Sequence, residues 1–234
     1  MEAQQSKLRH TCSSDKFFSP YSFKYGHIER IVDWIQNESG CCTPLRILDV
    51  GVDDKAYYPA LKKIGTLVTL DPLSQSGADI IADICDCDIR ENSFDAAFLF
   101  YILEHLKNPV SALASCKRIV RPGGYVAGIV PQYWHTHGYP SDYWRFTRFG
   151  ITHLLEHCGL KPQLLWPLGG PFLVAFHAIE IALRLRRANN PLKVLTYNAL
   201  GRLMNTLDHK LADHGEKEGQ SDCVAWSFIA RNEK

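Results

Sequence analysis

Arg46-Ile47-Leu48-Asp49-Val50-Gly51 is the stretch of sequence that decides the fold. Its apolar residues predict a strand buried on both faces, which ends at Gly51. Asp49 lies close to the end of this strand, and Gly51 has no Cβ to keep a ligand away from the backbone. Because parallel α/β sheets bind their ligands at the carboxyl ends of the strands, we expect a binding site here.

Strands and helices alternate on both sides of this stretch. Short apolar runs bounded by turn residues predict strands, and apolar residues at a spacing of three and four predict helices. We expect strands at residues 47–50, 67–70, 78–82, 94–100, 125–130, 164–166 and 224–230, and helices at 25–36, 57–64, 109–120 and 149–158. This alternation predicts a doubly wound, mostly parallel α/β sheet of seven strands.

Length and composition indicate one globular domain. The chain has 234 residues, of which 46% are hydrophobic and 22% charged, so a large core is expected rather than disorder. We expect a loose segment at 1–24 and a single domain at 25–234, with a helical insertion at about 170–215. A formal net charge of +1 gives no electrostatic reason to expect nucleic acid as a partner.

The cysteines and the N-terminus favour a cytoplasmic protein. None of the eight cysteines forms a C-x-x-C pair, and the first 15 residues are too polar for a signal peptide. We therefore expect free thiols, most of them acting as small buried hydrophobes.

Three carboxylates fall at the ends of the first three strands: Asp49, Asp71 and Asp83. Asp71 is placed to accept hydrogen bonds from both hydroxyls of a ribose, and Asp83 to accept one from an adenine amino group. The alternative for each is the cap of a helix or turn. The G-x-G-x-x-G fingerprint is absent, since Gly51 is followed by Val52-Asp53-Asp54-Lys55. Acidic residues there disfavour a pyrophosphate and suit S-adenosylmethionine, which carries a sulfonium and an ammonium.

The stretch from residue 46 to residue 159 resembles the methyltransferase-domain family of class I S-adenosylmethionine-dependent enzymes. The resemblance is carried by Leu48-Asp49-Val50-Gly51, Asp71, Ala82-Asp83, Asn92-Ser93-Phe94-Asp95, Leu103-Glu104-His105, Asn108-Pro109 and Arg121-Pro122-Gly123-Gly124. It implies a Rossmann-like fold whose last strand, at 224–230, is antiparallel. The resemblance also implies which residues contact the cofactor: Asp49 and Gly51 the methionine side, Asp71 the ribose, Asp83 with Ile84 the adenine, and Phe100 and Tyr101 after the fourth strand.

One branch of this family is similar in two further places. It has an aromatic residue where Tyr57 stands, and a histidine followed by Pro-x-Asp-Tyr-Trp-Arg-Phe-Thr, which here is His137 to Thr147. Most members of the family carry glycines where Asp53 and Lys55 stand in this chain. We therefore expect methyl transfer to an oxygen or nitrogen of a small-molecule or glycan-like acceptor, with a non-catalytic methyltransferase-like binding module as the alternative.

The segment after the fifth strand, residues 132–147, is dense in His, Tyr, Trp, Asp and Arg. His135 and His137 are candidate catalytic bases, because a neutral imidazole is available near pH 7. Asp142, Tyr143 and Arg145 are candidate substrate-binding residues, although Asp142 and Arg145 could equally pair with each other. No third ligand lies at a recognisable spacing from the two histidines, so we expect no metal site.

Residues 181–207 form a basic segment with interleaved apolar residues. It contains five basic residues and no acidic one. It fits peripheral contact with an anionic membrane, a cover over the site, a homodimer interface, or an ordinary helical insertion with a solvated basic face.

Overall fold

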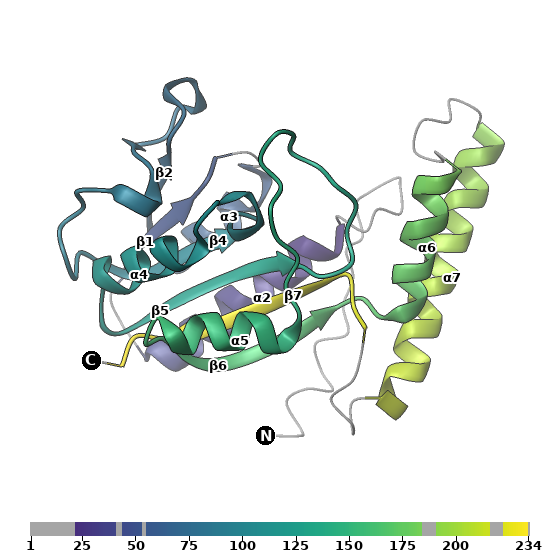
Figure 1. Ribbon diagram of the computed structural model, residues 1–234. Coiled ribbons are helices and arrows are strands. Elements are labelled where there is room, and N and C mark those ends of the chain that lie inside the picture. The colour runs from purple at the N-terminus through teal and green to yellow at the C-terminus, as the bar shows by residue number, and fades with distance from the viewer. Residues whose placement is uncertain (1–21, 41–43, 53–54, 184–190, 216–221, 234) are drawn as a thin grey trace.

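The computed structural model describes residues 22–40, 44–52, 55–183, 191–215 and 222–233, which form a seven-stranded sheet with helices on both faces (Figure 1). The strands are β1 (Leu45–Val50), β2 (Gly65–Asp71), β3 (Ile80–Ile81), β4 (Phe94–Phe100), β5 (Val120–Pro131), β6 (Lys161–Leu168) and β7 (Ala225–Arg231). Their order is β3-β2-β1-β4-β5-β7-β6, and β7 runs antiparallel to β5 and β6. The expected Rossmann-like fold, including its antiparallel last strand, is confirmed.

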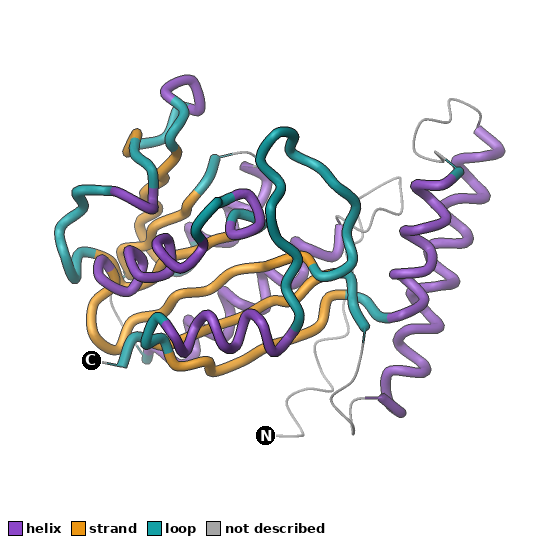
Figure 2. The backbone as a smooth tube through the Cα atoms, viewed as in Figure 1, coloured by secondary structure: helices purple, strands orange, loops and turns teal. Residues whose placement is uncertain are grey.

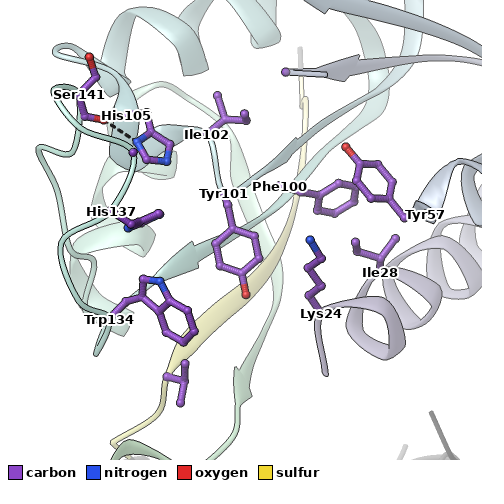
Figure 3. A pocket seen from close by; sticks show the side chains of 13 residues that line it. Lys24, Ile28, Tyr57, Phe100, Tyr101, Ile102, His105, Trp134, His137 and Ser141 are labelled. Carbon is purple, nitrogen blue, oxygen red and sulfur yellow. Dashed lines mark hydrogen bonds between the residues drawn. The ribbon is translucent and has the colours of Figure 1, made fainter. Parts of the chain in front are cut away.

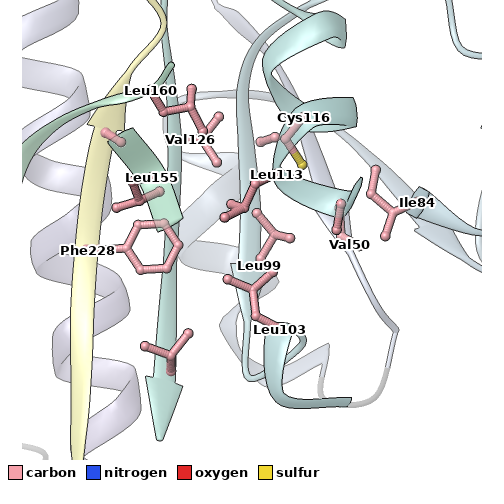
Figure 4. Close-up of a cluster of buried hydrophobic side chains, with 14 of the residues drawn as sticks. Val50, Ile84, Leu99, Leu103, Leu113, Cys116, Val126, Leu155, Leu160 and Phe228 are labelled. Carbon is pink, nitrogen blue, oxygen red and sulfur yellow. The ribbon is translucent and has the colours of Figure 1, made fainter. Parts of the chain in front are cut away.

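Helices cover both faces of the central strands, and most of the side chains of these strands are apolar (Figure 2). On one face, Leu48 and Leu99 pack against α4 (Pro109–Ile119) and α5 (Arg148–His157) (Figure 4). On the other face, Ile47 and Phe98 pack against α2 (Ser22–Ser39) and α3 (Tyr58–Lys62). Since successive side chains of a strand point to opposite faces, Asp49 lies on the α2 and α3 side, in step with Ile47.

Three element boundaries differ from the sequence prediction. α2 begins at Ser22, so residues 22–24 are helical rather than part of a loose segment. β6 spans Lys161–Leu168, so it begins three residues before and ends two residues after the strand expected at 164–166. β5 begins at Val120, because Val120 pairs with Phe94 and the strand then passes through Pro122-Gly123-Gly124 in an irregular register. A Cβ at Gly124 would lie 2.5 Å from the carbonyl oxygen of Asp95, which explains the glycine.

The helical insertion expected at about 170–215 contains α6 (Pro171–Ala182) and α7 (Pro191–Gly215), which lie side by side beyond the end of β6 (Figure 1). The buried Asp208 of α7 accepts hydrogen bonds from the backbone N–H groups of Gly170, Phe172 and Leu173, and so caps α6. Within the described part of the chain, every helix is too short or too polar to cross a bilayer.

Candidate functional site

A pocket of about 340 Å³ opens at the carboxyl ends of the strands. Gly51 after β1, Phe100 to Ile102 after β4, and Trp134, His137 and Gly138 after β5 line it, and α2 contributes Lys24 and Ile28 (Figure 3). The lining is mostly apolar and aromatic, and its volume lies in the range of small-molecule sites. The sequence prediction placed the site at this edge of the sheet, and four of its candidate residues line the pocket: Gly51, Phe100, Tyr101 and His137.

Gly51 is required at its position for two reasons. Its φ of 89° lies in the region that residues with a Cβ rarely adopt. A Cβ at Gly51 would also collide with the Cδ1 atom of Ile102, which follows the neighbouring strand β4. The chain therefore turns sharply at the end of β1, and a ligand can approach the backbone of Gly51 closely.

Asp49 lies fully buried beneath this turn. The hydroxyl of Tyr57, a pocket residue, donates a hydrogen bond of 2.9 Å to Oδ2 of Asp49. Oδ1 is buried and accepts no hydrogen bond from any described residue. Burial raises the pKa of the Asp49 carboxyl well above its usual range, and the Tyr57 hydrogen bond offsets only part of this effect. Asp49 itself does not line the pocket, although its partner Tyr57 does.

Asp71 lies at the end of β2 and is tied to the turn after β1. Its Oδ2 accepts a hydrogen bond of 2.9 Å from the N–H of Val52, and its Oδ1 accepts one of 2.8 Å from the N–H of Leu73. An ionised carboxylate has four lone-pair positions, so Asp71 can still accept from a ribose. Asp53, which follows Val52, lies outside the described residues.

Asp83 and Ile84 lie beyond β3 and do not line the pocket. The exposed Asp83 carboxylate accepts a hydrogen bond from the N–H of Cys85 and caps the short 3-10 helix Ile84–Asp86, while the Ile84 side chain is buried. Capping was the alternative considered for Asp83 in the sequence analysis.

Phe100 and Tyr101 end β4 inside the pocket. Phe100 stacks on Phe98 at 5.6 Å between ring centroids and meets the edge of the Tyr57 ring at 5.2 Å. Tyr101 adopts a φ of 58°, which is uncommon for a residue with a side chain, and its ring points into the pocket (Figure 3). Such strain at the end of a central strand is typical of binding sites.

The segment after β5 is fixed by the pair of Asp142 and Arg145. The two guanidinium Nη atoms donate to the two Asp142 oxygens at 2.7 and 2.8 Å. Arg145 also donates to the carbonyls of Trp134 and His135, and Asp142 accepts from the N–H of His137. The Arg145 hydrogen bonds hold the pKa of Asp142 below its usual range. Asp142 and Arg145 therefore pair with each other and hold the loop that carries the histidines.

The two candidate bases have different surroundings. His137 lines the pocket, and burial lowers its pKa, which keeps the imidazole neutral near pH 7. His135 lies next to the pocket, and its Nδ1 is 3.1 Å from Nε2 of the buried His177. Nδ1 of His177 is in turn 3.4 Å from the buried carboxylate of Glu180, and Trp134 stacks on the His177 ring. Tyr143, the remaining substrate-binding candidate, is 44% exposed outside the pocket lining.

Sequence reasoning missed the role of Glu104, whereas the Leu-Glu-His sequence favoured a pocket wall or a helix start for His105. Both residues belong to the short 3-10 helix Leu103–His105 that follows β4. Glu104 is fully buried, and burial raises its pKa to about 8. His105 lines the pocket opposite His137, with 4.8 Å between the ring centroids (Figure 3). Lys24 was missed as well, because the prediction left it outside the domain.

Comparison with known proteins gives one family and several similar folds. Residues 48–128 match the family described as the methyltransferase domain. Over 113 residues the chain is 27% identical to the ubiquinone biosynthesis O-methyltransferase of Alkalilimnicola ehrlichii. The aligned stretch covers 41% of this chain and 45% of that protein. The chain thus spans less than half the length of this curated relative.

Solved structures with the same fold include one bacterial and one archaeal example. One is the 1,6-didemethyltoxoflavin-N1-methyltransferase of Burkholderia thailandensis, solved with bound 1,6-didemethyltoxoflavin and S-adenosylhomocysteine. Its TM-score is 0.53 and its identity 12%, and the match covers 96% of this chain and 99% of that one. The other is an S-adenosylmethionine-dependent methyltransferase of Methanosarcina mazei, with a TM-score of 0.51, 11% identity and coverage of 84% and 96%. At these identities the similarity establishes the fold alone.

Proposed function

We propose that the chain is a class I S-adenosylmethionine-dependent methyltransferase, which its match to the methyltransferase domain over residues 48–128 supports, and that it transfers a methyl group from S-adenosylmethionine to a small-molecule or glycan-like acceptor. The observation that carries the proposal is the buried, unpartnered Oδ1 of Asp49 beneath a pocket of about 340 Å³. A buried carboxylate oxygen with no partner is costly, and a cationic ligand removes that cost.

The residues present fit this cofactor. Asp49 would accept from the ammonium of its methionine part, and Gly51 would let that part lie against the backbone. Asp71 would accept from the ribose hydroxyls. Asp83 and Ile84 lie outside the pocket lining and would flank the adenine only where the cofactor extends beyond it. Phe100 and Tyr101 would contact the cofactor at the end of β4. When bound, S-adenosylmethionine supplies a methyl group on a positively charged sulfur, which an acceptor displaces in line.

The residues of the chain would do three things in this reaction. The aromatic lining, with Tyr101 and Trp134, excludes water and holds a planar acceptor beside the cofactor. The pair of Asp142 and Arg145 would keep the histidine loop in place, and the exposed Tyr143 would contact only an acceptor that extends beyond the pocket lining. His135 or His137 receives the proton that the acceptor loses, His137 from the pocket wall and His135 with the support of His177.

The acceptor is proposed to be a ring-shaped hydroxyl or amine compound. The curated relative is named as an O-methyltransferase of ubiquinone biosynthesis, and the Burkholderia enzyme as an N1-methyltransferase of 1,6-didemethyltoxoflavin. Both names, like the aromatic lining here, favour a planar acceptor, and a stacked sugar ring fits the same lining.

Release of S-adenosylhomocysteine tests the proposal. The protein is incubated with S-adenosylmethionine and separate panels of catechols, N-heterocycles and sugars, and product formation is compared with that of the Asp49→Asn variant. Turnover with one panel that falls in the variant supports the enzyme. Binding of S-adenosylhomocysteine without turnover in any panel supports the alternative, a methyltransferase-like binding module.

The helical pair of α6 and α7 is proposed to contact a membrane surface or a second copy of the chain. Leu183, Leu192 and Leu195 are 65–69% exposed near the ends where the two helices are joined. Of the basic residues in this segment, Arg184, Arg186 and Arg187 lie outside the described residues. Flotation with anionic vesicles supports the membrane contact. A dimer in sedimentation that Leu195→Glu dissociates supports contact with a second copy of the chain. If neither vesicle binding nor a dimer is observed, the segment is an ordinary helical insertion.

A further inference from the structure

We propose that Glu104, His105 and His137 bind a divalent metal ion at the wall of the pocket. One ligand atom from each residue lies within 4.8 Å of the other two. Glu104 and His105 follow β4, whereas His137 belongs to the loop after β5, so the fold brings together groups that are far apart in the sequence. The sequence analysis considered only ligands near His135 and His137 and therefore expected no metal site.

The first argument is the state of the Glu104 carboxylate. The residue is fully buried, and neither of its side-chain oxygens has a hydrogen-bond partner among the described residues. The nearby guanidinium of Arg145 is already engaged by Asp142 and by the carbonyls of Trp134 and His135. A buried carboxylate without a partner is rare in native proteins, and coordination to a cation is one of the few ways to stabilise it.

The second argument is the orientation of the two imidazoles. Nδ1 of His105 is 2.5 Å from the carbonyl oxygen of Ser141, and Nδ1 of His137 is 3.2 Å from that of His135. A carbonyl oxygen only accepts, so both Nδ1 atoms carry the proton and both Nε2 atoms keep a lone pair. Histidines that bind metals show this pattern, with one nitrogen on the metal and the other donating to a carbonyl or carboxylate.

The ligand set selects the class of ion. Two imidazole nitrogens and one carboxylate oxygen suit Zn²⁺ and related transition ions, whereas Mg²⁺ and Ca²⁺ prefer oxygen ligands. Because His105 and His137 line the pocket, a fourth coordination position would face the ligand space (Figure 3). Three protein ligands with one open position are typical of catalytic rather than structural zinc.

The metal site would determine which acceptor is used, an inference that rests on the proposed function. An acceptor hydroxyl bound to the ion would lose its proton to a base more easily, and its oxygen would then bond to the methyl carbon while the methyl–sulfur bond breaks and S-adenosylhomocysteine leaves. His137 is then a metal ligand, which leaves His135 to receive the proton. The acceptor is accordingly a phenol, catechol or other hydroxyl compound rather than an amine.

Zinc titration of the metal-free full-length protein tests the site directly. The protein is freed of metal with a chelator, and Zn²⁺ is added in a calorimeter; Co²⁺ is added in parallel, since its visible spectrum reports tetrahedral nitrogen and oxygen ligands. We expect one equivalent of Zn²⁺ to bind. Glu104→Gln keeps the side-chain volume but removes the charge, and it should weaken binding by at least about 10-fold, the loss seen even for residues that only support a ligand.

A second histidine pair provides the matched control. His153 and His157 lie one helical turn apart on the exposed surface of α5, with 6.2 Å between ring centroids, and could bind zinc adventitiously. His153→Asn should leave the stoichiometric site unchanged. The proposal is overturned if the wild type binds no zinc, or if binding survives Glu104→Gln and disappears with His153→Asn. A parallel titration with S-adenosylhomocysteine separates failure of the metal site from failure of the proposed function. If the protein binds S-adenosylhomocysteine but no zinc, only the proposed metal site is contradicted.

Discussion

Replacing Asp49 by Asn should weaken cofactor binding and also remove a pH dependence of stability. The side chain is fully buried, its Oδ2 accepts from Tyr57, and its Oδ1 has no described partner. Asn keeps the size of the side chain and an acceptor for Tyr57 but carries no charge. The change therefore isolates the contribution of the carboxylate.

The magnitude of the binding effect follows from the kind of interaction that is lost. A hydrogen bond to a charged group contributes about 1.5–3 kcal/mol, which corresponds to a loss of roughly tenfold to somewhat over a hundredfold in affinity. Calorimetric titration with S-adenosylhomocysteine measures it. Asp88→Asn, which removes an exposed carboxylate of the same type, is the control and should leave the affinity unchanged.

The stability effect has a definite sign. Because burial raises the pKa of Asp49 in the folded protein, the unfolded chain releases this proton first as the pH rises. Stability from this group is fully present below its unfolded pKa of about 3.9 and is lost at higher pH by up to about 1.4 kcal/mol per pH unit. Urea unfolding of the cofactor-free protein should therefore show a fall in stability from pH 4 upward that Asp49→Asn lacks. An unchanged affinity in this variant would refute the placement of the cofactor ammonium at Asp49.

Three further changes test other parts of the structure. Gly51→Ala should cost at least about 1–2 kcal/mol of stability, because the φ of 89° strains any residue with a Cβ and Ile102 occupies the space; the urea midpoint measures it, and an unchanged midpoint would contradict the geometry. His27 is held neutral by burial, which lowers its pKa to about 3, so its stabilising contribution is present above pH 6.5 and declines toward pH 3. His27→Gln should remove a loss of about 2 kcal/mol between pH 6.5 and pH 5, as measured by urea unfolding at the two pH values. Asp208→Ala leaves three backbone N–H groups at the start of α6 without their acceptor. The change should lower the free energy of unfolding by about 1–3 kcal/mol and the Tm by several degrees. Faster hydrogen exchange confined to other helices would argue against this cap.

The sequence predicted the sheet because its signals are local. The apolar run from Phe94 to Phe100 is buried on both faces, and the runs that form β1 and β2 end at Gly51 and at Asp71, so strand ends and their order along the chain could be located. Asp49 lies in β1 and Gly51 directly follows it, as the sequence predicted for this reason. The fifth strand expected at 125–130 was too short, because pairing of Val120 with Phe94 extends β5 back through Pro122-Gly123-Gly124.

The pocket wall could not be predicted in the same way. Whether Glu104 has a partner depends on where Arg145 and Asp142 lie after β5, and this is decided by tertiary packing rather than by local sequence. The same holds for the contact between His135 and His177, which joins the loop after β5 to α6. Lys24 enters the pocket only because α2 packs across the sheet face.

Calorimetric titration of the purified wild-type protein with S-adenosylhomocysteine tests the central claim most directly. The account predicts one saturable site with a Kd between about 1 μM and 1 mM, the usual range for enzyme ligands, and weaker binding in Asp49→Asn. Absence of both heat and a thermal shift at millimolar S-adenosylhomocysteine would contradict it, because the pocket above Asp49 would then serve some other ligand.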